Sequence, residues 1–177
     1  MQIKNSNDHY GMIAMILHWA MAILLIALLI LGLRMTGLPI SLEKLKFYGW
    51  HKEYGILALI LFIIRIIWRF MDITPSLSLP LMEIIAARAV HWAFYGFMFT
   101  IPMTGWLITS AAGVPVSFFG LYVLPNLIRP NNDIMILFQE IHKWLGYGLI
   151  TTIILHAFAA FKHHFINKDT ILRRMLP

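Results

Sequence analysis

Two histidines interrupt a long apolar segment near the carboxyl end of the chain. From Trp144 to Phe161 the sequence has no charged residue, yet His142 precedes this run and His156 lies within it. At about 100° per residue, fourteen helical residues return to within roughly 40° of the starting direction, and at about 1.5 Å per residue they span about 21 Å. One face of a single helix is therefore predicted to carry two imidazoles, one toward each surface of a membrane.

The composition is that of an integral membrane protein. Of 177 residues, 60% are hydrophobic and 12% charged, and the mean hydropathy is +0.77, which is too apolar for a soluble domain of this size. We expect residues 1–177 to form one all-α domain, a transmembrane four-helix bundle of up-down-up-down topology. The expected helices cover roughly residues 10–34, 47–70, 84–112 and 134–164. Met35 to Lys46 reads as a polar turn with a short interfacial helix, and Val114 to Asn132 as an interfacial loop that caps one surface.

The charges and the missing cysteines exclude several classes of protein. With no cysteine, disulfides, thiolate metal sites, iron–sulfur clusters and covalently attached c-type haem are excluded. The net charge of +6 comes from Lys and Arg in short loops beside apolar runs, where they anchor helices to headgroups rather than bind nucleic acid. A slight excess of these cations on the side of the two termini predicts that both termini are cytoplasmic in a bacterial inner membrane.

Four histidines fall into two pairs at matched depth in the expected bundle. His18 and His156 both lie toward the cytoplasmic side, while His51 and His142 both begin helices on the outer side. Gly32, fourteen residues after His18, lies at the outer depth and would leave room for a flat ring. A bare metal ion would need further thiolate or carboxylate ligands, whereas haem needs only two axial imidazoles. The spacing therefore predicts two haems stacked across the membrane.

Residues near the two pairs fit the same hypothesis. If the second and fourth helices are aligned on their first histidines, Gly55 and Gly146 coincide one turn deeper and leave space for a macrocycle. The same alignment places Arg65 at the depth of His156, where it would pair with a haem propionate, with Arg69 one turn further out.

His91 is the competitor among the candidate ligands. It begins the third helix on the cytoplasmic side and could replace His18 or His156. Its shallower position favours an interfacial or propionate-binding role.

These residues and their surroundings resemble the bacterial dihaem cytochrome b561 family, which also includes the b-type cytochrome subunits of nickel–iron hydrogenases. The resemblance covers almost the whole chain. It rests on LHW with His18, WHKEYG with His51 followed by Arg65, IHKWLGYG with His142, LHAFAAFKHH with His156 and His163, and the closing KDTILRRM. It implies four transmembrane helices and two b haems, each with two histidine ligands, that pass electrons across the inner membrane.

The resemblance also implies two alternative activities. Some members are described as superoxide oxidases, which oxidise periplasmic superoxide and reduce ubiquinone, and others as electron-transfer subunits linking a dehydrogenase to the quinone pool. We expect the first, a superoxide:quinone oxidoreductase, with iron bound by His18 and His156 on the cytoplasmic side and by His51 and His142 on the periplasmic side. A haem-free metal transporter is the third class considered. The sequence assigns no catalytic residue.

The substrates suggest further residues. Superoxide would be steered by cations on the outer side, and a quinone needs a proton donor near the cytoplasmic haem. His163, two turns past His156, is the favoured donor and His91 the second; the alternative for His163 and His164 is a solvated helix end. The outer-side cations are Lys44, Lys46, Lys52, Arg129 and Lys143.

Overall fold

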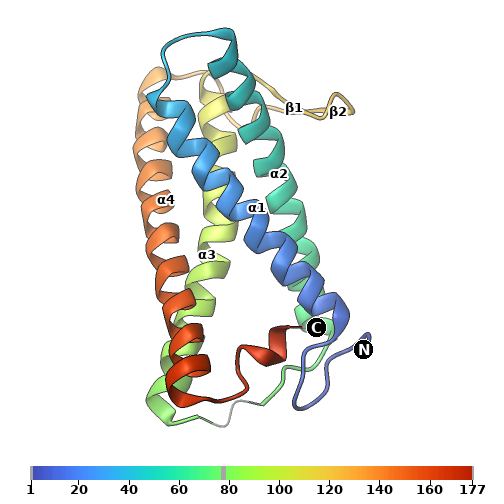
Figure 1. Cartoon of the computed structure of the whole chain (residues 1–177). Coiled ribbons are helices and arrows are strands. Elements are labelled where there is room, and N and C mark those ends of the chain that lie inside the picture. The colour runs from blue at the N-terminus through green and yellow to red at the C-terminus, as the bar shows by residue number, and fades with distance from the viewer. Residues whose placement is uncertain (1, 77–78, 177) are drawn as a thin grey trace.

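Four long helices that run side by side form the molecule (Figure 1). The computed structural model describes residues 2–76 and 79–176. All four helices are long and apolar enough to cross a membrane, so the expected transmembrane four-helix bundle is confirmed. They are α1 (Met12–Gly37), α2 (Leu42–Met71), α3 (Leu81–Ala111) and α4 (Asn132–Phe161).

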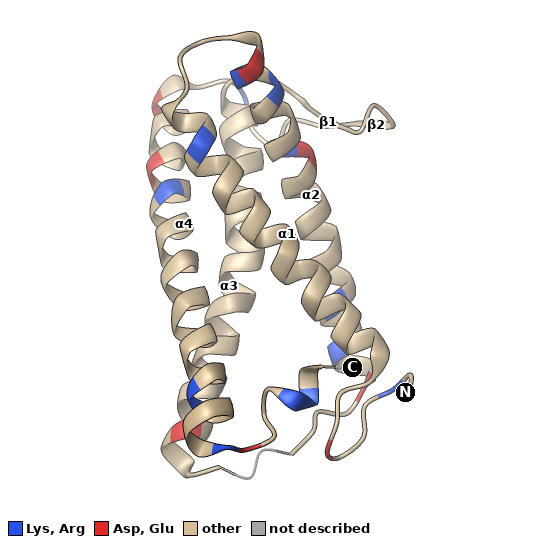
Figure 2. Ribbon diagram, in the orientation of Figure 1, with Lys and Arg blue, Asp and Glu red and all other residues tan. Residues whose placement is uncertain are grey.

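The bundle has a thin protein core and an apolar outer surface. Helix α1 packs on α2, α2 on α3 and α3 on α4. Large side chains such as Ile23 and Phe158 remain 67% and 68% exposed, as expected where lipid is the solvent. Lys, Arg, Asp and Glu gather toward the two ends of the bundle and leave the middle apolar (Figure 2). The central core cluster consists of Met21, Leu28, Ala58 and Met98.

The connection between the first two helices is much tighter than the sequence predicts. Helix α1 continues to Gly37, and α2 begins at Leu42 rather than near residue 47. Ser41 caps α2 by accepting the Lys44 amide at 3.2 Å, and the Lys44 ammonium donates to the Leu38 carbonyl at 2.6 Å. These local hydrogen bonds satisfy groups at both helix ends, so the polar turn predicted over Met35 to Lys46 is confined to residues 38–41, and the residues after it form the start of α2.

The segment between α3 and α4, which the sequence predicted as a loop over one surface, contains a small hairpin. Strand β1 (Val116–Phe118) pairs antiparallel with β2 (Tyr122–Leu124). Gly120 adopts a φ of +71° in the turn, a conformation that costs glycine little. The hairpin packs on α2 through Ile56. It therefore covers one end of the bundle.

Both chain termini lie at the opposite end (Figure 1). After α4 the chain widens into a π-helical segment (Lys162–Asn167), and the tail then returns to α1, where the Trp19 indole donates to the Met175 carbonyl at 2.8 Å. The Asn5 amide donates to Asp72 at 2.9 Å. These contacts join the N-terminal segment, the end of α2 and the tail.

Candidate functional site

The structure brings the four histidines together as the two predicted pairs. The ring centres of His18 on α1 and His156 on α4 lie 6.3 Å apart. Those of His51 on α2 and His142 on α4 lie 6.1 Å apart. Helix α4 therefore contributes one imidazole to each pair.

The donor set and its spacing fit a haem. With a metal–nitrogen bond of about 2 Å on each side, two imidazoles on one metal hold their ring centres roughly 6 Å apart, and both observed separations match. Two imidazoles are sufficient because the porphyrin supplies the other four donors. Within residues 2–76 and 79–176, no cluster of three or more His, Asp or Glu could hold a bare metal ion. Ligation itself stays a prediction.

His91 on α3 also lies close to the His18–His156 pair. Its ring centre is 6.0 Å from that of His156, as near as the ring of His18. His18 is partly buried whereas His91 is exposed. The burial favours His18 as the partner of His156, but the distances alone do not separate the two.

Arg65 lies directly beside the His18–His156 pair. One guanidinium nitrogen is 3.3 Å from His18 Nδ1, and because a guanidinium only donates hydrogen bonds, Nδ1 accepts in this arrangement. For Nε2 of a neutral His18 to bind a metal, the ring proton must be on Nδ1, which requires Arg65 to turn toward another acceptor. Arg69 lies in the last turn of α2 and is exposed.

The His51–His142 pair is enclosed by small residues of the other two helices. A Cβ built on Gly32 of α1 would lie 3.2 Å from His51 Cε1, and one on Gly105 of α3 would lie 3.4 Å from His142 Cε1. Thr104 Oγ1 is 2.9 Å from His142 Nδ1. Gly32 thus makes room for an imidazole, not for a macrocycle as the sequence suggested. No sequence signal pointed to Thr104, because threonine is common at helix contacts in membranes.

Space remains where the sequence predicted a flat ring. A Cβ on Gly55 or Gly146 would meet nothing within 4 Å. His51 Nδ1 is buried without a hydrogen-bond partner in the described part of the chain.

His163 is not a solvated helix end. It is 9% exposed in the π-helical segment, its Nδ1 bonds Asp169, and its Nε2 lies 3.9 Å from a Glu83 oxygen. Partial burial raises the pKa of Asp169, but hydrogen bonds from the Ile171 amide and from His163 outweigh it and hold the pKa below its ordinary value. His163 thus links two carboxylates at the end of the bundle that holds the termini.

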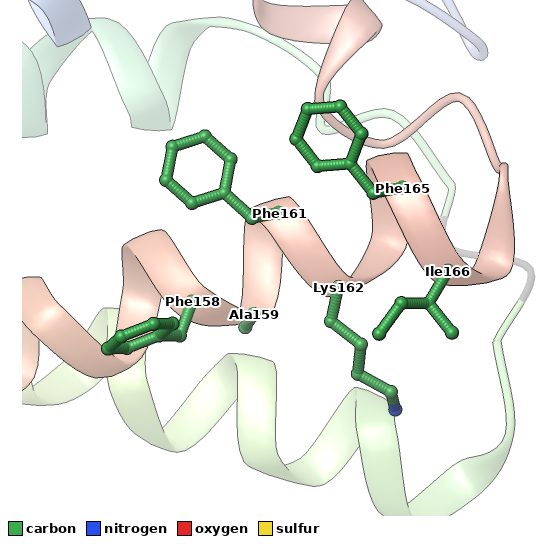
Figure 3. Close-up of a pocket in the computed structure, with 6 residues that line it drawn as sticks. All are labelled: Phe158, Ala159, Phe161, Lys162, Phe165 and Ile166. Carbon is green, nitrogen blue, oxygen red and sulfur yellow. The ribbon is translucent and has the colours of Figure 1, made fainter.

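A surface depression lies near His163 but does not include it (Figure 3). Neither His163 nor His91 lines it. The Lys162 ammonium, its one charged group, pairs with Glu83 at 3.1 Å. A quinone site with a histidine proton donor is therefore not formed in this depression. Its lining residues are Phe158, Ala159, Phe161, Lys162, Phe165 and Ile166.

Sequence comparison identifies the family. Residues 9–177 match the family model described as prokaryotic cytochrome b561. The chain belongs to the prokaryotic cytochrome b561 family. Membership establishes electron transfer in a bacterial membrane with b-type haem, as the motifs around the four histidines indicated.

Three relatives support membership of the cytochrome b561 family. Cytochrome b561 homolog 2 of Escherichia coli K12 is 35% identical over 99% of this chain and 95% of the relative. Cytochrome b561 homolog 1 of the same organism is 34% identical over 72% and 73% of the two chains. A protein of Yersinia pestis described as probable superoxide oxidase CybB is 32% identical over the same shares, 72% and 73%.

Proposed function

We propose that this cytochrome carries electrons across the bacterial inner membrane between a periplasmic-side site, His51 and His142, and a cytoplasmic-side site, His18 and His156. The observation that carries the proposal is the pair of imidazole separations, 6.1 and 6.3 Å, with α4 shared by both sites. A b haem held at each site would supply one-electron redox chemistry. With two histidines holding each haem, neither site would leave the metal a free position for dioxygen.

Arginines of α2 complete the cytoplasmic-side site in this proposal. Arg65 turns from His18 Nδ1 to a propionate, which frees that nitrogen to carry the ring proton while Nε2 binds the metal. Arg69, one turn further out, offers a second propionate partner. Gly55 and Gly146 leave the space that the macrocycles need.

We further propose superoxide as the electron donor and ubiquinone as the acceptor. Two superoxide anions lose one electron each and become dioxygen, while one ubiquinone takes up two electrons and two protons. The description of the Yersinia pestis relative supports the donor. The outer end, taken as periplasmic, also carries Lys46, Lys52 and Arg129, which have no carboxylate within 4 Å among the described residues. Such cations attract an anion.

His163 is the proposed proton source on the cytoplasmic side. Its buried ring bonds Asp169 and lies 3.9 Å from a Glu83 oxygen, so the imidazole is held in a fixed orientation from which it would give a proton to a quinone. His91, which is exposed beside His156, is the second candidate for this role or for a propionate contact.

The test is reduction of the purified protein by enzymatically generated superoxide in the presence of a ubiquinone analogue. We expect the bands of reduced low-spin b haem to appear, one quinone to be reduced for every two superoxide anions consumed, and superoxide dismutase to suppress both signals. If dithionite reduces the haem but superoxide does not, the donor is wrong. Stable co-purification of a dehydrogenase would then identify the chain as an electron-transfer subunit.

A further inference from the structure

We infer that Thr104 of α3 is a positioning residue of the periplasmic-side site, which fixes the tautomer of His142 and strengthens the electron donation of its imidazole. The inference rests on the proposed function, since it concerns a haem bound by His142. Helix α3 supplies no ligand to this pair, yet it supplies the residue that orients one of the ligands.

The hydrogen-bond network around Thr104 determines which nitrogen of His142 carries the proton. Thr104 Oγ1 lies 2.9 Å from His142 Nδ1 and 2.8 Å from the Ile101 carbonyl oxygen. The hydroxyl has one hydrogen, and the carbonyl can only accept. Both contacts are hydrogen bonds when the hydroxyl donates to Ile101 and accepts from Nδ1–H. The lone pair of His142 is then on Nε2, the nitrogen left free to bind a metal.

The position is also rigid. Thr104 is 7% exposed, and the adjacent Gly105 lets the imidazole approach so closely that an added Cβ would lie 3.4 Å from His142 Cε1. The ring is therefore held between a hydroxyl and a helix backbone. A ligand fixed in this way loses little freedom when a metal binds.

His142 differs in this respect from the other three proposed ligands. His51 Nδ1 has no hydrogen-bond partner in the described part of the chain, and His18 Nδ1 faces a group that only donates, Arg65. In the described structure, His142 alone of the four has a side-chain oxygen within hydrogen-bond distance of Nδ1. An acceptor at the distal nitrogen makes the imidazole more basic and stabilises the oxidised metal. Thr104 is therefore expected to lower the reduction potential of the periplasmic-side haem.

The experiment is a redox titration, followed by absorption, of the haem-loaded wild type and of three variants. In Thr104→Val, which keeps the shape and removes the acceptor, we expect one of the two midpoint potentials to rise. The expected rise is about 59 mV, which corresponds to a roughly tenfold change in the equilibrium constant of a one-electron reduction. The haem affected should be the one lost in His142→Ala. Thr104→Ser should restore the wild-type potential. Thr100→Val should change neither potential, because Thr100 Oγ1 bonds only the Gly96 carbonyl, at 2.8 Å.

Each of the remaining outcomes either supports or overturns the inference. Unchanged potentials in Thr104→Val would overturn the inference, and so would equal shifts in Thr104→Val and Thr104→Ser. Loss of the same haem from both of these variants would overturn it as well. Loss of that haem from Thr104→Val alone would support the role of the hydroxyl. A wild-type protein that binds no haem would refute the proposed function and this inference with it. A wild-type protein that binds haem, together with unchanged midpoint potentials in Thr104→Val, would refute the inference only.

Discussion

Glycines decide where the imidazoles of the periplasmic-side pair can lie. Gly32 of α1 meets the edge of the His51 ring, and Gly105 of α3 meets the edge of the His142 ring. A Cβ at 3.2 Å from a ring carbon is tighter than ordinary van der Waals contact, so any larger side chain at Gly32 must push the ring aside. The positions of the two proposed haem ligands thus depend on glycines that are not themselves proposed to bind the metal.

Substitution at Gly32 should therefore affect one haem. We expect Gly32→Val to reduce the occupancy of the periplasmic-side haem at least severalfold and to leave the cytoplasmic-side haem in place, because His51 can no longer hold its position. The measurement is the haem-to-protein ratio together with the redox titration. The matched control is Gly37→Val at the end of α1, where a Cβ meets nothing within 4 Å. Full occupancy in Gly32→Val would contradict the role of this contact.

The residues that could be found from the sequence are those that are unusual in their surroundings. His142 and His156 are conspicuous because imidazoles are rare in an apolar helix, and their spacing alone placed them on one face. Thr104 is ordinary in such a helix. The contact of His163 with Asp169 depends on a turn beyond the end of α4, which periodicity does not describe.

Among the elements, α3 connects the ligand region to the hairpin that covers one end of the bundle. Near the end of α3, Ser110 is completely buried, donates to the Trp106 carbonyl at 2.8 Å and accepts from the Leu127 amide at 3.0 Å. This second bond fastens the segment after β2 to α3.

Removing that bond should loosen the loop without changing the helices. In Ser110→Ala the Leu127 amide is left without its acceptor, which costs about 1–3 kcal/mol if it stays buried. We expect faster hydrogen exchange at Leu127 and earlier proteolysis within residues 114–131. Thr109→Ala is the control, because its hydroxyl bonds only the Trp106 carbonyl, at 2.9 Å. Equal exchange in the wild type and Ser110→Ala would show that the loop is held elsewhere.

Helix number and order followed from the sequence, but helix ends and the hairpin did not. Twenty or more apolar residues in a row identify a membrane helix regardless of its neighbours. The end of α1 and the start of α2 depend instead on hydrogen bonds of Ser41 and Lys44. The strands of the hairpin have three residues each, too few to show an alternating pattern, and they form against Ile56 of α2.

At the scale of the whole molecule, the Lys, Arg, Asp and Glu residues gather toward the two ends of the bundle (Figure 2). At the outer end, the Lys143 and Glu140 side chains form an ion pair and Arg34 lies 3.9 Å from Glu43, so these charges largely cancel. Lys46, Lys52 and Arg129 remain at this end, against the acidic Glu53 and Asp133, so the field that an anionic donor meets keeps a small excess of positive charge.

This distribution predicts a salt-dependent reaction with superoxide. Raising the ionic strength from about 0.01 M to about 0.15 M should slow haem reduction roughly tenfold, because screening shortens the range of attraction. Lys52→Gln should slow it at low salt, whereas Lys168→Gln, at the end that holds the termini, should not. Stopped-flow reduction rates provide the measurement. A rate that is independent of salt and of Lys52 would exclude electrostatic steering.

The central claim is that α4 serves two separate haem sites, one shared with α2 and one with α1. Haem content per chain in two double variants tests it most directly. We expect His51→Ala/His142→Ala to keep one haem, because both changes fall in the same site, and His51→Ala/His156→Ala to keep none, because each change removes a different site. One haem retained in the second variant, or none in the first although the protein is folded, would contradict the pairing.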